Sequence, residues 1–162
     1  MKTLPERKPN RLEGYDYSRG GVYFLTVCTK GRESLFWDMP LICKTVGATC
    51  GRPPLSALGA LAEEELSRME AIYPGIHVHK AAIMPDHIHL LVSLDSGRPQ
   101  VAPTPSVSGI MKQFKGKLTK LAGRPIWQKS YYDHVIRDEN DFLSKWTYMD
   151  RNPGRWIEKH LP

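Results

Sequence analysis

The middle of the chain contains two short runs with the composition of β-strands, GIHVHKAAI at 75–83 and HIHLLVSL at 87–94. Met84, Pro85 and Asp86 separate the two runs and have the character of a tight turn. We therefore predict a β-hairpin with a three-residue loop. In that register Ala81 lies opposite His89.

The other elements are predicted from the spacing of apolar residues. Segment 22–29 is rich in β-branched and aromatic residues and follows two glycines, so we predict a strand. Segments 55–72 and 110–121 repeat apolar residues at helical spacing, with Glu65 as a charged exception on the first stripe and Leu121 as the last apolar member of the second. Segment 126–136 is expected to be extended. Asp138 is expected to open a last helix that Pro153 closes.

The order of these elements favours one class of fold. No strand–helix–strand unit repeats, and no glycine-rich phosphate loop follows a strand. We therefore expect an α+β fold, in which helices pack against an antiparallel sheet. With 162 residues and 41% hydrophobic content, the chain is expected to form one domain, 1–162. Three prolines and little apolar content predict a flexible loop at 95–108.

Two expectations concern the location of the protein and its thiols. No apolar run is long enough to span a membrane, and the first residues lack the apolar middle of a secretory signal. We therefore expect a soluble, cytoplasmic protein with no membrane partner. The three cysteines form no CxxC pair, so we interpret them as idle thiols rather than metal or redox groups.

Positive charge is concentrated in one part of the chain. The formal net charge is +6, and segment 111–137 holds seven basic residues against one acid, which accounts for the whole excess. Such a stretch suits a polyanionic partner. The basic residues that we expect to follow phosphates are Lys112, Lys115, Lys120, Lys129 and Arg137.

The second strand of the hairpin presents two histidines on one face. His87 and His89 alternate with Ile88 and Leu90, so both imidazoles leave the apolar side together. Residues two apart on a strand are separated by roughly 7 Å, and two imidazoles at that spacing can reach a common metal ion. A second pair, His77 and His79, leaves open which pair binds a metal or whether all four do, although we interpret these two as surface or supporting histidines.

The last predicted helix carries a tyrosine outside its apolar face. Phe142, Trp146 and Met149 define the face expected to be buried, and Tyr148 is turned about 200° from Trp146. Helical phase therefore frees Tyr148 from the core. From the residues alone, a tyrosine at the surface is the commoner interpretation.

Three blocks of sequence, taken in order, resemble one known family. They are MPDHIHLLV, then IWQKSYYDHVIRDENDF, then Tyr148-x-x-x-Asn152-Pro153. Their order and spacing resemble the REP-associated tyrosine transposases, in the single-tyrosine branch of the HUH nucleases. VYFLTVCTKGR near the N-terminus looks like the first strand of that family. The resemblance covers most of the chain, with 40–54 and 95–108 as the poorly matched parts.

This resemblance implies a fold, a site and a reaction. The fold would be RRM-like (ferredoxin-like), with His87 and His89 as ligands of a divalent metal, Mg or Mn, and Asn152 as a third ligand. Tyr148 would attack single-stranded, hairpin-forming DNA and form a 5′-phosphotyrosine, from which the strand is rejoined. The partner would be single-stranded or hairpin DNA. The protein would be a monomer or a homodimer.

Several aromatic residues of the second block have two interpretations. Trp127, Tyr131 and Tyr132 could stack on bases, or they could belong to the core of the sheet, which we expect for at least one of them. We expect His134 to contact DNA or to be structural.

Two other functions remain open from the sequence. One is a transposase-derived protein that binds DNA without cleaving it. The other is an unrelated metal-dependent hydrolase that uses all four strand histidines and does not need Tyr148.

Overall fold

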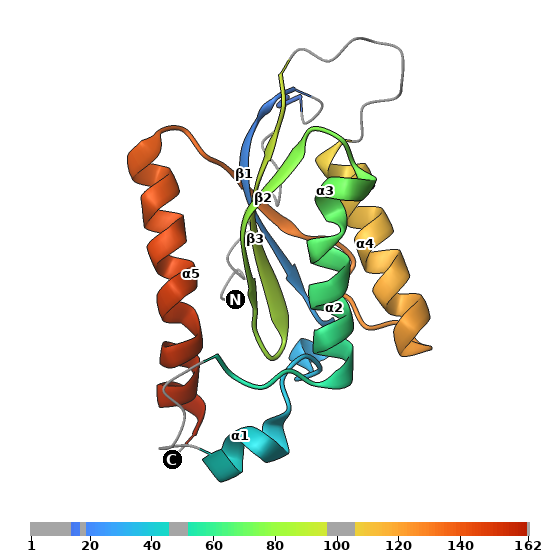
Figure 1. Ribbon diagram of the computed structural model, residues 1–162, viewed down its shortest axis with the longest axis vertical. Helices are drawn as coiled ribbons and strands as arrows, with labels where there is room; N and C mark the ends of the chain where they lie inside the picture. The colour runs from blue at the N-terminus through green and yellow to red at the C-terminus, as the bar shows by residue number, and fades with distance from the viewer. Residues whose placement is uncertain (1–13, 17–18, 46–51, 97–105, 162) are drawn as a thin grey trace, which may run out of the picture.

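The computed structural model describes residues 14–16, 19–45, 52–96 and 106–161. Its centre is a four-stranded antiparallel sheet in the order β2-β3-β1-β4 (Figure 1). The strands are β1 (Gly21–Cys28), β2 (Ile76–Ile83), β3 (His87–Leu94) and β4 (Tyr132–Val135). The predicted α+β fold, helices against an antiparallel sheet, is confirmed.

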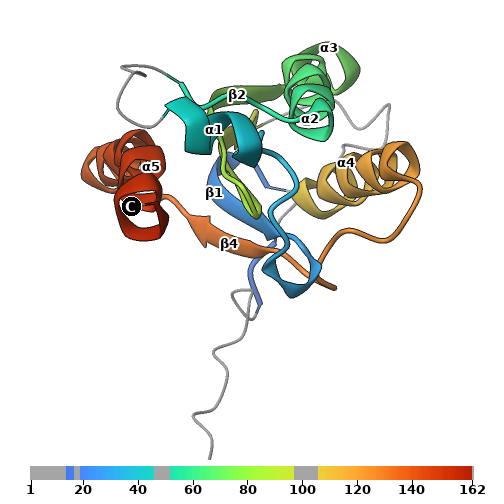
Figure 2. The same cartoon turned by 90° about the horizontal axis from the view of Figure 1, so that it is seen from below.

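The helices divide between the two faces of the sheet. Helices α2 (Ala57–Ser67), α3 (Met69–Ile72) and α4 (Val107–Ala122) cover one face, and α5 (Glu139–His160) covers the other (Figures 1 and 2). The main core fills the space under α2 to α4, and a smaller core lies under α5. A short turn η1 (Lys30–Arg32) and helix α1 (Met39–Thr45) follow β1. Among the helices described, none is both long and apolar enough to cross a membrane.

The predicted hairpin forms, but its loop is shorter than expected. The amide of Met84 donates to the carbonyl of His87 at 2.8 Å, so Pro85 and Asp86 alone make the turn. The shorter loop shifts the pairing by one residue, and Ala82, not Ala81, lies opposite His89. The predicted partner was therefore wrong, although a second alanine takes its place. A bulge between Val78 and Lys80 changes the register further along the hairpin.

The predicted helix at 55–72 is divided at Arg68 into α2 and α3. Ser56 caps α2 by accepting from the amide of Gly59, as a serine N-cap should. Gly59 is required at this position, because a Cβ atom there would collide with the carbonyl of Phe36. Glu65 forms an ion pair with Lys117 of α4, which explains a carboxylate on the apolar stripe.

Helix α4 follows its predicted pattern with two differences. It ends at Gly123, whose φ of 69° suits a glycine at a helix C-terminus. Leu121 is 47% exposed, so its predicted place on the buried stripe was wrong. The helix begins at Val107, inside the loop predicted at 95–108, while 97–105 lie outside the described residues. The side chains that α4 buries are Val107, Ile110, Met111, Phe114 and Leu118.

Helix α5 begins as predicted but continues beyond Pro153. Asp138 caps it by accepting from the amide of Asp141 at 2.8 Å. The helix runs on to His160, so the expectation that Pro153 closes it was wrong. A proline inside a helix costs about 3 kcal/mol. Packing offsets that cost, because Trp156 and Ile157 beyond the proline join the cluster around Trp37, Ile42 and Met84.

Candidate active site

His87 and His89 point their rings toward each other on the face of β3 that α5 covers. Their Nε2 atoms are 3.1 Å apart. Each Nδ1 atom is held from behind: that of His87 lies 2.6 Å from Oδ1 of Asp86, and that of His89 lies 2.8 Å from Oγ1 of Thr26. Partners of this kind fix the orientation of imidazoles that act as metal ligands. The two free nitrogens therefore converge on one point.

The surroundings also affect the pKa values of Asp86 and His89. Burial opposes ionisation of Asp86, but the hydrogen bond from His87 and the charges of His87 and Arg32 outweigh it and lower the pKa of the carboxyl group. The ionised Asp86 accepts a hydrogen bond from Nδ1 of His87 and so orients that ring. Burial, aided by the charge of His87, lowers the pKa of His89 to about 3. His89 is therefore neutral at physiological pH, the form in which imidazole binds metals.

The residues around the pair fit a divalent cation. Two nitrogens bound to one metal at about 2.0–2.1 Å lie roughly 3 Å apart when the angle between them is near 100°. Asn152 lines the same hollow, where its amide oxygen is the atom suited to a metal, and its buried Nδ2 atom has no hydrogen-bond partner among the residues that the structure describes. The described residues bring together no group of three or more His, Cys, Asp or Glu side chains. The donor set that could hold a metal is therefore two imidazoles and one amide, which leaves room for substrate oxygens.

Tyr148 lies beside the histidine pair. Its ring centroid is 5.3 Å from that of His89 and 6.1 Å from that of Phe24, which itself stacks on His89. The side chain is 42% exposed, as its helical phase predicted. Tyr148 shares one stripe of α5 with Lys145 and Asn152, at spacings of three and four residues. Helical geometry thus aims all three side chains at the same hollow.

This hollow has a volume of about 510 Å³ and an unusual charge balance. Arg32 and Lys145 line it, and no carboxylate of the described residues does. Arg32 is held by the Sγ atom of Cys28 at 3.2 Å and by Asp86 at 3.5 Å. Burial raises the pKa of Cys28, so that residue stays a neutral thiol. The remaining wall residues are Phe24, Thr26, Cys28, His87, His89, Tyr132, Tyr148 and Asn152.

Arg32 and Lys145 did not stand out in the sequence. Lys145 could have been found, because it precedes Tyr148 by three residues on the same helix and so shares its face. Arg32 is close in sequence to Thr26 and Cys28, but it is far in sequence from the histidine pair and from Tyr148. Only the turn after β1, where Arg32 has a positive φ of 58°, carries it beside Asp86.

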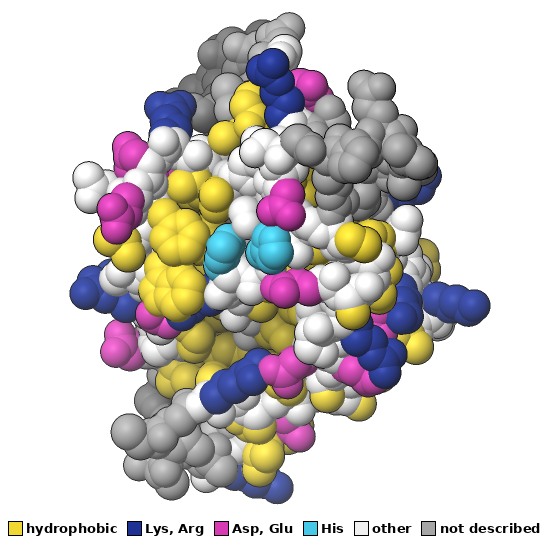
Figure 3. Space-filling model, turned by 45° about the horizontal axis from the view of Figure 1, so that its top comes forward, with side chains coloured by type: hydrophobic (Ala, Val, Ile, Leu, Met, Phe, Trp, Pro, Cys, Tyr) yellow, Lys and Arg dark blue, Asp and Glu magenta, His cyan; other side chains and the backbone are white. Residues whose placement is uncertain are grey.

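The predicted basic residues of α4 lie on the other face of the sheet. Lys112, Lys115 and Lys120 belong to a helix that packs opposite α5 (Figure 2). The ammonium group of Lys115 donates to the carbonyls of Gln128 at 2.8 Å and Ser130 at 3.2 Å, and burial lowers its pKa. On the face drawn in Figure 3, Lys and Arg side chains are interspersed with Asp and Glu. The structure therefore does not gather these lysines at the histidine pair.

The remaining predicted contacts surround β4. Lys129 precedes this strand and Arg137 follows it. The Nε2 atom of His134 lies 2.8 Å from Asp141 at the start of α5. Trp127 packs against Phe36 and Phe114 in the main core, and its indole N–H donates to the carbonyl of Lys115 at 3.0 Å. The structure thus gives Trp127 and His134 partners within the protein.

The second histidine pair does not join the first. His77 and His79 are exposed on β2. The Nε2 atom of His77 lies 3.1 Å from Asp95, and that of His79 lies 2.9 Å from Oγ of Ser93. These partners support the interpretation of His77 and His79 as surface histidines.

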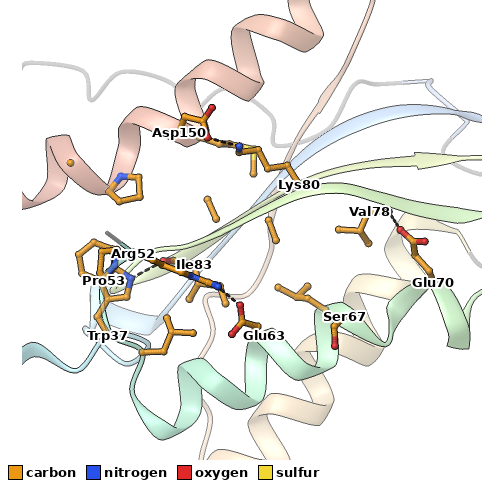
Figure 4. Close-up of a pocket in the computed structure, with 17 residues that line it drawn as sticks. Trp37, Arg52, Pro53, Glu63, Ser67, Glu70, Val78, Lys80, Ile83 and Asp150 are labelled. Atoms are coloured by element: carbon orange, nitrogen blue, oxygen red, sulfur yellow. Dashed lines mark hydrogen bonds and ion pairs between the residues drawn. The ribbon is translucent and has the colours of Figure 1, made fainter. Parts of the chain in front are cut away.

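A larger hollow of about 700 Å³ lies between α2, α5 and the outer edge of β2 (Figure 4). Ion pairs join Lys80 to Asp150 and Arg52 to Glu63 across its walls. None of the residues predicted for the site lines it. Size alone would therefore select a hollow that contains none of these residues, whereas the convergent polar groups lie in the smaller one.

Comparisons with known proteins show which proteins this chain is similar to. No family model matches the chain. An uncharacterised Haemophilus influenzae protein is 26% identical, over 98% of this chain and 94% of that protein. A second Haemophilus influenzae protein, provisionally named a REP-associated tyrosine transposase, is 24% identical over 85% of this chain and 73% of its own length. The REP-associated tyrosine transposase of Escherichia coli is 20% identical over 88% of this chain and 73% of its own length.

A solved structure confirms the likeness of fold. It is a REP-associated tyrosine transposase bound to a REP hairpin, with a TM-score of 0.62 and 20% sequence identity. The match covers 90% of this chain and 73% of that one.

Proposed function

We propose that this chain, which is similar to the REP-associated tyrosine transposases, cleaves and rejoins single-stranded DNA with Tyr148 as the nucleophile. One observation carries the proposal. A partly exposed tyrosine lies 5.3 Å, ring to ring, from the neutral His89, whose Nε2 atom converges with that of His87. The hollow that they share is lined by two cations and no carboxylate. A phosphodiester is the substrate that suits such a lining.

The side chains of the hollow have distinct tasks in this proposal. Arg32 and Lys145 attract the phosphate and offset its charge. His87, His89 and Asn152 would hold a divalent metal, Mg or Mn, which when bound supplies positive charge that makes the phosphorus more electrophilic. Asp86 and Thr26 keep the two imidazoles oriented from behind.

The covalent step uses the phenol oxygen of Tyr148. This oxygen attacks phosphorus, and the bond between phosphorus and the 3′-oxygen breaks with its electron pair on the leaving oxygen. The phenol proton passes to water, and the 3′-oxygen takes a proton from water. The products are a 5′-phosphotyrosine and a free 3′-hydroxyl. Attack by a 3′-hydroxyl on the phosphotyrosine reverses these events, so rejoining needs no nucleotide triphosphate.

Hairpin DNA is the substrate that the comparisons favour. The matched structure is of a relative bound to a REP hairpin, and its fold covers 90% of this chain. Helix α4, which carries Lys112, Lys115 and Lys120, and helix α5, which forms one wall of the hollow, lie on opposite faces of the sheet (Figure 2). DNA that touches both can pass the edge formed by β4, where Lys129 and Arg137 flank the strand. We propose this path for the bound strand.

The test is a search for a covalent adduct. The protein is incubated with hairpin DNA that has a single-stranded flank, in the presence of Mn²⁺, and the products are separated under denaturing conditions. The expected result is a protein–DNA adduct that Tyr148→Phe and His87→Ala both abolish. Tyr73→Phe is a matched control, because Tyr73 lies beside Gln113 on the other side of the sheet and should leave the adduct intact.

The competing functions give different results in the same assay. If the wild-type protein binds the hairpin but forms no adduct, it is a DNA-binding protein without cleavage. If strands are cleaved in Tyr148→Phe, the metal-dependent hydrolase is correct and the proposal is wrong. Far-ultraviolet circular dichroism of each variant shows that a lost adduct is not a lost fold.

A further inference from the structure

Tyr132 lies at the open end of a row of residues that starts at the histidine pair. Thr26 of β1 is the register partner of His89 on one side and of Tyr132 on the other. Directly opposed residues on neighbouring strands point to the same face of a sheet. His89, Thr26 and Tyr132 therefore share the face on which Tyr148 lies, and Tyr132 is the member at the β4 edge.

The side chain of Tyr132 is free, in contrast with those of its aromatic neighbours. It is 44% exposed, and within the described part of the chain neither its ring nor its hydroxyl group contacts another aromatic ring or a hydrogen-bond partner. Tyr131 is 5% exposed with its hydroxyl 3.1 Å from that of Ser108, and Trp127 packs in the main core. Of these three residues, Tyr132 alone can offer a ring face to a ligand.

A lone exposed aromatic residue is common and needs no function. Tyr132 differs because it lines the same hollow as Tyr148 and the histidine pair. Adjacent strands are about 4.8 Å apart, so the Cα atoms of His89 and Tyr132 are separated by roughly 10 Å. Neighbouring nucleotides of an unstacked single strand can span this distance. The two cations and the absence of carboxylates in the lining suit the phosphates between them.

We propose that Tyr132 is a base-stacking platform for a nucleotide next to the phosphate that Tyr148 attacks. The inference rests on the proposed function and deepens it. One exposed ring binds a base, the cations of the hollow bind the phosphate, and the histidine pair marks the point of attack. Stacking on a ring is tolerant of base identity, because every base has a π-face. Tyr132 therefore holds the strand in register without selecting its sequence.

The test measures binding apart from chemistry, in a Tyr148→Phe background that cannot form the adduct. Two hairpin DNAs are compared, one with a mixed-sequence single-stranded flank and one whose flank of equal length is abasic. Removal of one stacking contact weakens binding by about 5- to 100-fold. Tyr132→Ala should therefore weaken binding of the normal flank by that factor and leave binding of the abasic flank unchanged. Tyr132→Phe keeps the ring and should bind both DNAs as before.

A matched control is Leu143→Ala, because Leu143 is 51% exposed on α5 and does not line the hollow. It should bind both DNAs normally. The inference is overturned if Tyr132→Ala binds the two flanks with unchanged affinity, or if it weakens both equally. Failure of the proposed function gives a different result, since the protein with an intact Tyr148 would then form no covalent adduct, whatever its affinity for the two flanks.

Discussion

Lys145 has a position from which it can act on the reacting groups directly. Its ammonium group is 5.3 Å from the Phe24 ring centroid, it lines the hollow, and it stands one helical turn before Tyr148. It forms no ion pair with a carboxylate among the residues that the structure describes. Its charge is therefore available to a phosphate.

We expect Lys145→Met to slow adduct formation by about 10- to 100-fold, because one preorganised cation is removed from the charge that develops at phosphorus. Quench-flow or manual time courses of the adduct, with DNA in excess, measure this rate. Lys159→Met is the control, since Lys159 lies in the last turn of the same helix and outside the hollow. Equal rates in the wild-type protein, Lys145→Met and Lys159→Met would show that Lys145 does not contribute to the reaction.

Single residues also show how much of the site the sequence could predict. Alternation along one strand was enough to put His87 and His89 on a common face. It could not choose the alanine opposite His89, because the choice between Ala81 and Ala82 depends on one hydrogen bond in the turn. The sequence could not predict Arg32 as a site residue, since its place beside Asp86 follows from the path of the chain after β1.

Helix α5 is held at its first turn by a network of acceptors. Asp138 accepts from the amide of Asp141, while the carboxylate of Asp141 accepts from the amide of Arg137 at 3.1 Å and contacts His134. Reciprocal contacts of this kind make a helix start well defined. Burial opposes ionisation of Asp141, but these hydrogen bonds outweigh it and lower its pKa.

Asp141→Asn should therefore lower the free energy of unfolding by about 0.5–1 kcal/mol at neutral pH. Because the pKa of Asp141 is lower in the folded protein, its contribution is present above the unfolded value of about 3.9 and is lost as pH falls through the folded value. Urea unfolding of both proteins at pH 7 and near pH 3 measures the difference. If the difference in unfolding free energy between the two proteins is the same at pH 7 and near pH 3, the charge of Asp141 does not have this role.

Among the helices, the sequence predicted where each one lies in the chain better than it predicted where each one ends. Periodicity placed α4 and α5, because one face of each is buried against the sheet. It could not foresee that α5 passes through Pro153, since the packing that offsets the proline involves Trp37 and Met84, residues far away in the chain. It could not foresee that Arg68 separates α2 from α3 either.

For the whole molecule, the attachment of α5 to the sheet sets the position of Tyr148. Lys80 of β2 forms an ion pair with Asp150, and its ammonium group lies 4.2 Å from the centroid of Trp146. Asp150 and Trp146 stand two residues on either side of Tyr148. One lysine thus joins the sheet edge to the part of α5 that carries the nucleophile.

We expect Lys80→Met to cost about 0.5–1 kcal/mol of local stability, because an exposed ion pair and a cation–π contact are lost while the aliphatic stem is kept. Hydrogen exchange should show faster exchange of α5 amides and unchanged exchange in β3. Lys44→Met, in α1, is the comparison. If α5 and β3 exchange faster by the same factor, Lys80 supports the fold as a whole rather than the docking of α5.

The arrangement of layers was the part of the molecule that composition could not predict. Segment 111–137 holds the excess positive charge, and charge counting placed it near the chemistry. The chain instead packs α4 on the face opposite α5, because its apolar stripe belongs to the main core. Charge in a sequence indicates a partner, but only the fold decides which surface that partner meets.

The outer edge of β2 has a consequence for the behaviour of the protein in concentrated solution. The carboxylate of Glu70 accepts from the amide of Val78, and the indole of Trp37 donates to the carbonyl of Ile83, each at 2.7 Å (Figure 4). These contacts occupy one amide and one carbonyl group of the strand, and the bulge after Val78 interrupts its regular pairing. Unprotected edges recruit strands from other chains and lead to aggregation. Self-association by sheet extension is therefore disfavoured at the β2 edge of the sheet.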